Sequence, residues 1–229
     1  MSRKGRRDKQ RGRRALDYRA MMSLDGEVLQ VRPYAGYAAI TAGQVATPEQ
    51  GAAGEVTLYD VACTAALPVS ATEAATGITT RYDVSGSEYP VLPPSAMVVS
   101  PKKPLTTHVH RESGVVCIGP LWQELKGKEL LAELVLRVVR AYNYQDPATD
   151  ELGFQPAALF YRRTLRGRPF NPDLVLPAVP DDVFQIVGAA ESRPRVAVVV
   201  GEATPRRDRR VSVAAPRASR LEIVSGGGS

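Results

Sequence analysis

Cysteine and histidine are scarce in this sequence. Its 229 residues include two cysteines and two histidines. Two cysteines are too few for a disulfide framework. There is no Cys-x-x-Cys pair, and the two histidines and one cysteine of "HVHRESGVVC" lack the ligand spacing of a zinc site. The sequence also has no Gly-rich phosphate loop. We therefore expect free thiols in a reducing cytoplasm, no metal and no cofactor.

Long apolar runs are missing as well. No window approaches the roughly 18 consecutive apolar residues that a membrane-spanning helix requires. No apolar segment directly follows the basic N-terminus, so we expect no secretory signal. The 44% of apolar residues is nevertheless enough for an ordinary hydrophobic core. The sequence therefore predicts a cytoplasmic globular protein with no membrane partner.

The positive charge lies almost entirely at the N-terminus. Residues 1–14 contain eight Lys or Arg and one Asp, a net charge of +7. Because the whole chain carries +6, the remaining residues carry −1. We expect residues 1–14 to be a disordered basic tail, because like charges repel and nothing apolar offers a core. Weak nucleic-acid contact through this tail is an alternative use of it.

The body of the chain begins with a pattern typical of short antiparallel strands. A short helix is expected near residues 13–22, and the strand-like segments follow it. "YPVLPP" (89–94) contains three prolines, which exclude a central strand and favour a stiff edge segment. The expected strands cover residues 26–34, 35–45, 54–67, 78–84 and 95–100. The first half of the chain thus predicts an α+β fold with an antiparallel meander.

One long helix and a change of texture mark the second half. Residues 123–142 carry apolar side chains at helical spacing, and Pro147 cannot continue this helix. A second helix is expected over 155–163. Short β-branched runs then favour a β-rich C-terminal extension over 171–224, before a flexible 225–229. We assign residues 15–170 to the main domain.

The two cysteines occur in different settings. Cys63 lies inside the apolar run "LYDVACTAAL", which predicts a small buried side chain with an inert thiol. Cys117 lies at the end of "GVVCIGP", where a strand-like run meets Gly-Pro. Side chains at such strand ends reach solvent, and functional residues concentrate there. Cys117 is therefore the candidate nucleophile.

The surroundings of Cys117 resemble those of the ubiquitin-conjugating enzymes, in their divergent bacterial form. That family orders a Tyr-Pro…Pro-Pro segment, a His-Pro-Asn motif, a Gly-x-Ile-Cys nucleophile, a Trp, a crossing helix and an Asp-Pro loop. Here these elements read "YPVLPP", "HVH", "GVVCIG", "W", "ELLAELVLRVVRAY" and "NYQDP". Both the Trp and the Asp-Pro come a few residues early, as one compact deletion after Cys117 would produce. The match covers roughly residues 13–165.

The resemblance implies a conjugating-enzyme fold and a thioester mechanism. Cys117 would accept a ubiquitin-like protein from an activating-enzyme-like adenylyltransferase and pass it to a protein lysine. The resemblance also implies an anti-phage or similar bacterial pathway. The His-Pro-Asn motif is absent, and "HVH" lies one residue closer to the cysteine. Either His108 or His110 could therefore take the oxyanion role of the family's Asn, and Asp146 is the candidate for orienting the incoming amine.

Other interpretations of the same residues stay open. The missing Asn would suit an inactive module that binds a ubiquitin-like protein or an activating enzyme, whereas the retained cysteine argues against it. The two histidines could also be ordinary loop residues, and Asp146 an ordinary helix-stop residue before proline. We interpret Asn143 as a turn residue and Trp122 as a packing residue.

Overall fold

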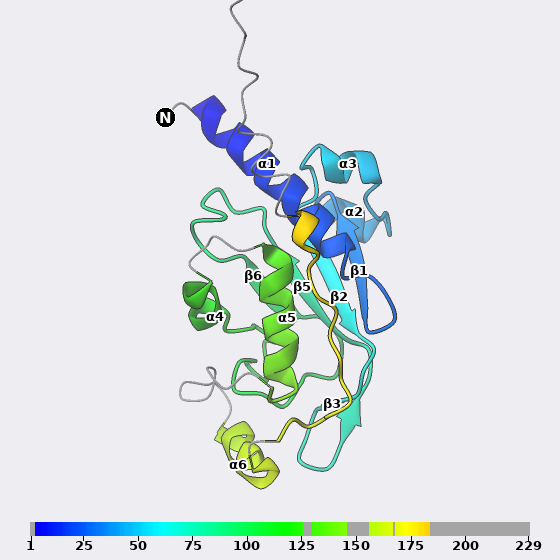
Figure 1. The fold of residues 1–229 in the computed structure, drawn as a ribbon, viewed down its shortest axis with the longest axis vertical. Coiled ribbons are helices and arrows are strands. Elements are labelled where there is room, and N and C mark those ends of the chain that lie inside the picture. Colours follow the sequence, from blue (N-terminus) through cyan, green and yellow to red (C-terminus); the bar gives the residue numbers. More distant parts are fainter. Residues whose placement is uncertain (1–2, 126–129, 146–155, 167, 184–229) are drawn as a thin grey trace, which may run out of the picture. The chain divides into compact units, whose positions relative to one another are not determined.

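The computed structural model describes residues 3–125, 130–145, 156–166 and 168–183. Its fold is α+β, with helix α5 lying across one face of an antiparallel sheet (Figure 1). The sheet has the order β1-β2-β5-β6. Each of its strands therefore pairs with the strand of this sheet that comes next in the chain. Its strands are β1 (Leu29–Tyr34), β2 (Leu58–Cys63), β5 (Ile78–Asp83) and β6 (Ser95–Val98). The predicted meander is thereby confirmed.

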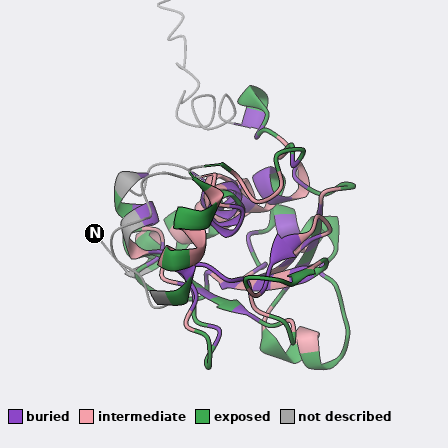
Figure 2. Ribbon diagram, turned by 90° about the horizontal axis from the view of Figure 1, so that it is seen from below, coloured by how far each residue is buried: buried purple, intermediate pink, exposed green. Residues whose placement is uncertain are grey.

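Alternating side chains determine which face of the sheet is buried. In β5, Ile78, Thr80 and Tyr82 are buried while the residues between them are half-exposed. The Thr80 hydroxyl lies 3.1 Å from the Tyr142 hydroxyl of α5, so this face is the one that the helix covers. Residues of the sheet and of α5 accordingly share one buried core, and the buried stretches of the ribbon are drawn in purple in Figure 2.

Two segments between the strands differ from the expectation. Residues 35–45 were expected to form a strand, but they contain the short helix α2 (Tyr37–Thr41). Their alternation is weak, and helix α2 buries none of its residues. The small polar stretch before β5, for which no strand was expected after residue 67, forms part of a second, two-stranded sheet of β3 (Leu67–Pro68) and β4 (Ala74–Ala75).

The N-terminal helix corrects the expectation of a disordered tail. Helix α1 runs without a break from Arg3 to Met22. Its basic half is attached to the body, because the Gln10 amide donates to the Ser87 carbonyl and the Arg14 guanidinium donates to the carbonyls of Val84 and Ser85. Like-charge repulsion is therefore opposed by tertiary hydrogen bonds that residues 1–14 alone do not reveal.

A close backbone contact holds α1 against helix α3 (Pro48–Ala52). Thr47 and Gln50 form a capping box at the start of α3. Gly54, which follows α3, has a φ of +68°. A Cβ atom at this position would lie 2.2 Å from the carbonyl oxygen of Arg11 in α1. Only glycine permits both the left-handed conformation and this approach.

The helix predicted over 123–142 is divided in two, which corrects that expectation. Helix α4 covers Gly119–Glu124, and α5 covers Leu131–Tyr142. Leu130 has extended backbone angles, so α5 has its own beginning there. Nine of the twelve residues of α5 are buried. A helix that is apolar on most sides is a central element of the core rather than a surface helix.

Helix α6 (Pro156–Leu165) confirms the second predicted helix. After it, residues 168–183 contribute Leu174, Val179 and Val183 to the same core as α5. Residues 171–183 contain no strand, and the rest of the predicted β-rich extension lies outside the described residues. The assignment of 171–224 as an extension, and of 225–229 as flexible, stays a prediction. Among the described helices, none is long and apolar enough to cross a membrane.

The C-terminal end of α5 is fixed by a buried asparagine. Asn143 caps α5 and is fully buried. Its side-chain amide donates to the Asn171 carbonyl at 2.9 Å, and its side-chain oxygen accepts from the Asn171 N–H at 2.7 Å. The predicted turn residue therefore also joins α5 to the returning segment.

Candidate functional site

Residues 108–117 form a hairpin that extends the sheet beyond β6. Val109 and Val116 face each other across it, and the Cys117 N–H donates to the His108 carbonyl at 2.7 Å. The hairpin attaches to β6 because the Val116 N–H donates to the Ala96 carbonyl at 2.9 Å. The three residues that carry the sequence prediction here, His108, His110 and Cys117, are therefore brought together on one structural unit.

Gly114 makes this attachment possible. It has a φ of +76°, and a Cβ atom there would lie 2.7 Å from the Val98 carbonyl oxygen. The glycine of the "Gly-x-x-Cys" pattern is thus required both for the turn and for the close approach to β6. The hairpin cannot shift along β6 without losing this fit, so the position of Cys117 is determined by the sheet.

The Cys117 thiol lies where the hairpin ends and helix α4 is about to begin. Ile118 caps α4, which starts at Gly119. Cys117 is partly exposed, whereas Cys63 in β2 is buried. Burial raises the pKa of the Cys63 thiol, which makes the thiolate still rarer at neutral pH. Of the two cysteines, Cys117 is the more accessible, and Cys63 is a core residue, as predicted; the nucleophilic role of Cys117 stays a prediction.

His108 acts on the main chain at Cys117. Its side chain is 2% exposed, and its Nδ1 atom lies 3.1 Å from the Cys117 carbonyl oxygen. A carbonyl oxygen can only accept, so Nδ1 carries a proton. His108 thus binds both polar main-chain groups of Cys117. Its carbonyl accepts from the Cys117 N–H, and its imidazole donates to the Cys117 carbonyl. His108 is therefore a positioning residue for the cysteine backbone.

His110 has the opposite arrangement of ring nitrogens. The Ser113 N–H donates to His110 Nδ1 at 3.2 Å, and the Ser113 hydroxyl lies 3.0 Å from the same atom. Nδ1 is thus an acceptor, which leaves the proton of the neutral ring on Nε2. His110 is half-buried, in contrast to His108. The two histidines flank Val109, which makes the bridge to Val116.

The remaining predicted residues fall into two groups. Asp146 lies outside the described residues, so its candidate role stays a prediction. Tyr89 and Trp122 are both buried, and their ring centroids lie 6.0 Å apart with a tilt of 35°. Trp122 is therefore a packing residue, as expected, and it joins α4 to the "YPVLPP" segment.

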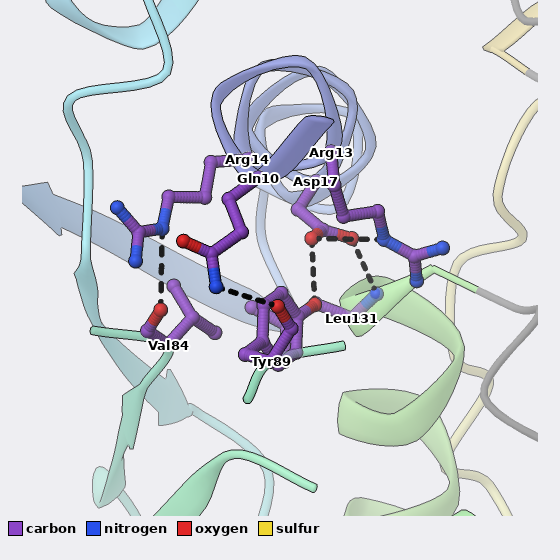
Figure 3. Close-up of polar contacts among 7 residues, drawn as sticks. All are labelled: Gln10, Arg13, Arg14, Asp17, Val84, Tyr89 and Leu131. Atoms are coloured by element: carbon purple, nitrogen blue, oxygen red, sulfur yellow. Dashed lines mark hydrogen bonds and ion pairs between the residues drawn. The ribbon is translucent and has the colours of Figure 1, made fainter. Parts of the chain in front are cut away.

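A buried carboxylate, Asp17, holds three elements together behind this segment (Figure 3). It accepts hydrogen bonds from the Tyr89 hydroxyl at 2.6 Å, the Leu131 N–H at 2.9 Å and the Arg13 guanidinium at 3.2 Å. Burial raises the pKa of Asp17. Leu130, at the N-cap position of α5, makes no side-chain cap hydrogen bond. The Asp17 carboxylate of α1 therefore accepts from the first N–H of α5 in its place.

Three features of this region were not predicted from the sequence: Asp17, Ser113 and the charged residues that flank the hairpin. Asp17 is an acid in the middle of a predicted helix, and nothing near it indicates that it would be fully buried. Ser113 lies three residues after His110, which is a spacing that a turn brings together. The run "PKKP" (101–104) could have been noticed as two adjacent cations held between prolines.

No protein-family model matches the chain, and no curated protein matches it. The function is therefore inferred from the geometry of this site and from the resemblance of its motifs.

Proposed function

We propose that this protein is a conjugating enzyme that carries a ubiquitin-like protein as a thioester on Cys117. The observation that supports it best is the partly exposed thiol at the end of a hairpin whose main chain is clamped by His108. A thioester carrier needs an accessible sulfur at a defined position and little further machinery, because the acyl group already arrives activated.

The order of the elements also supports the proposal. The resemblance implies a meander, a Tyr-Pro segment, a nucleophile loop and a crossing helix, in that order. The chain has a meander, the segment around Tyr89, the hairpin with Cys117 and then helix α5. Assignment to the conjugating-enzyme fold is part of this proposal, because an α+β arrangement alone is shared by many functions.

The proposed reaction has two steps. The Cys117 thiolate attacks the thioester carbonyl on the activating enzyme, a tetrahedral oxyanion forms, and the thiol of the activating enzyme leaves with the proton that Cys117 gave up. A lysine amine of an acceptor protein then attacks the Cys117 thioester. The new amide forms, the amine loses its proton, and the Cys117 thiol is regenerated.

His110 is the oxyanion donor that we favour. Its Nε2 bears the proton of the neutral ring, because Ser113 occupies Nδ1. An N–H directed at the oxyanion stabilises negative charge that exists only in the transition state. His108 is already bonded to the Cys117 carbonyl through its Nδ1–H, so its role in the proposal is to position the cysteine.

The thioester is tested by mixing the protein with ATP and with adenylating enzymes and ubiquitin-like proteins from the same genome. We expect a band shift that reductant reverses. Cys117→Ser should give an adduct that resists reductant, since an oxygen ester replaces the thioester, and Cys117→Ala should give none. Cys63→Ala is the matched control and should retain the labile adduct. A labile adduct on Cys117→Ala would refute the proposal.

The same experiment distinguishes the inactive binding module. A module would co-purify with the ubiquitin-like protein or the activating enzyme, yet it would form no reductant-labile adduct under any condition. His110→Ala adds a second criterion. It should slow discharge to free lysine by about a hundredfold, which is typical for loss of one oxyanion donor.

A further inference from the structure

A cationic pocket of about 260 Å³ lies beside the tip of the same hairpin. Three elements line it: the β3–β4 hairpin, the "PKKP" segment and the turn of the 108–117 hairpin. Its polar side chains are those of Ser70, Glu73, Lys102, Lys103 and Arg111. The three cations come from two separate stretches of chain, so they meet only in the folded protein.

The pocket carries a positive charge that its own residues do not neutralise. Lys102 is paired with Glu73, the only acidic residue in the lining. The Lys103 ammonium donates to the Glu112 carbonyl at 2.6 Å, and the Arg111 guanidinium donates to the Val69 carbonyl at 3.5 Å. Carbonyls orient these two groups without cancelling their charges. Two positive charges thus remain for a ligand.

This charge matches a phosphomonoester better than a carboxylate. A phosphoserine side chain carries about −1.5 to −2 charges at pH 7 and offers three acceptor oxygens, whereas a carboxylate carries only −1. Arginine donates two parallel hydrogen bonds to phosphate, and lysine adds a point charge. No aromatic side chain lines the pocket, so it lacks the stacking surface that a nucleotide base normally uses.

The position of the pocket indicates a polypeptide ligand. Arg111 is three residues from His108, whose backbone is bonded to Cys117, and three residues of chain span at most about 10 Å. An extended peptide could therefore occupy the pocket with one side chain and present an amine near Cys117 with another, some three residues away. This placement rests on the proposed function, but binding to the pocket does not.

We infer that Lys103, Arg111, Lys102 and Ser70 form a binding site for a phosphorylated side chain of a polypeptide. The test uses a short Gly/Ala peptide with one phosphoserine, and calorimetric titration at low salt. The double variant Lys103→Gln/Arg111→Gln should weaken binding about tenfold or more, because each group makes a charge-assisted contact. Arg32→Gln, which removes one positive charge from the far edge strand β1, should leave binding unchanged.

A second variant changes the affinity in the opposite direction, so a failure to fold cannot imitate it. Glu73→Gln removes the carboxylate that competes for Lys102 and should tighten phosphopeptide binding several-fold. The unphosphorylated peptide should not bind, and the peptide with Glu in place of phosphoserine should bind more weakly. Equal binding of phosphorylated and unphosphorylated peptides, or no effect of the double variant, would overturn the inference.

Two further arms separate the sources of the signal. If inorganic phosphate bound but the phosphopeptide did not, the pocket would be an adventitious anion site and the inference would be wrong. Cys117→Ala should bind the phosphopeptide as the wild type does. Phosphopeptide binding without any thioester on Cys117 would therefore support the phosphate site and refute the conjugating function. A thioester on Cys117 without phosphopeptide binding would support the conjugating function and refute the phosphate site.

Discussion

Replacing Asp17 with alanine should cost about 3–5 kcal/mol of unfolding free energy. Asp17 is fully buried and accepts from the Tyr89 hydroxyl, the Leu131 N–H and the Arg13 guanidinium. The substitution removes this acceptor from the Tyr89 hydroxyl and the Leu131 N–H, and it removes the counter-charge of Arg13. A hydrogen bond to a charged group contributes about 1.5–3 kcal/mol, and removing one partner of a buried ion pair typically costs about 3–5 kcal/mol. The cost should not exceed this range, because the Arg13 side chain is partly exposed to solvent.

Urea unfolding followed by circular dichroism measures this cost. Tyr89→Phe removes only one of the three bonds and should cost about 1.5–3 kcal/mol. In the double variant Asp17→Ala/Tyr89→Phe the two losses of unfolding free energy should not add, because both substitutions remove the same hydrogen bond. Asp8→Ala makes the same substitution at an exposed position of α1 and is the matched control. A cost for Asp17→Ala as small as that for Asp8→Ala would refute the idea that this carboxylate holds α1 to α5.

The pH dependence follows from the direction of the pKa shift. Burial raises the pKa of Asp17 in the folded protein, so the folded state retains a proton that the unfolded chain releases near its ordinary pKa of about 3.9. The stabilising contribution of this titration is therefore complete below about pH 4 and is lost as the pH rises through the raised pKa. The stability difference between wild type and Asp17→Asn, which does not titrate, should shrink over that range. A difference that grew with pH would contradict the shift.

Three other perturbations test the fold and the thiols. Gly54→Ala should cost more than about 1 kcal/mol in chemical denaturation, because it combines a positive φ with a backbone clash against α1; an unchanged midpoint would show that α1 is not docked there. Asn143→Ala should cost about 2 kcal/mol, since the main-chain groups of Asn171 lose their partner, and hydrogen exchange at the end of α5 should quicken. Iodoacetamide should alkylate Cys117 well before Cys63 in the native protein, as peptide mass spectrometry would reveal, and equal rates would count against an accessible thiol at Cys117.

Local patterns were sufficient for much of the fold. The strands β1, β2, β5 and β6 follow from side-chain alternation, since a strand with one buried face must alternate. The buried stripe of α5 follows from helical spacing, and the inert setting of Cys63 follows from its apolar neighbours. The position of Cys117 at the end of a paired segment was also readable, because Gly114 and the Gly-Pro after the cysteine limit that segment on both sides.

Other features depend on contacts between distant parts of the chain. The basic N-terminus is helical because Gln10 and Arg14 reach carbonyls some 70 residues away, and no local pattern contains those partners. The separation of α4 from α5 was also missed, because residues 123–142 were taken as one helix although "KGKE" (126–129) interrupts the apolar pattern with polar residues and a glycine. The difference between His108 and His110 depends on which polar atom each ring meets, and that is decided by the pairing of the hairpin.

By itself the sequence determined which segments are apolar on one side, where glycine and proline interrupt them, and which cysteine lies at an edge. These are local properties, carried by neighbouring residues. The tertiary structure alone decided that Asp17 meets the start of α5, that His108 clamps the cysteine backbone, and that Lys103 and Arg111 share a pocket. Each of these depends on where distant backbone segments come together, because a charged or polar side chain acquires its role from the partner that folding places beside it.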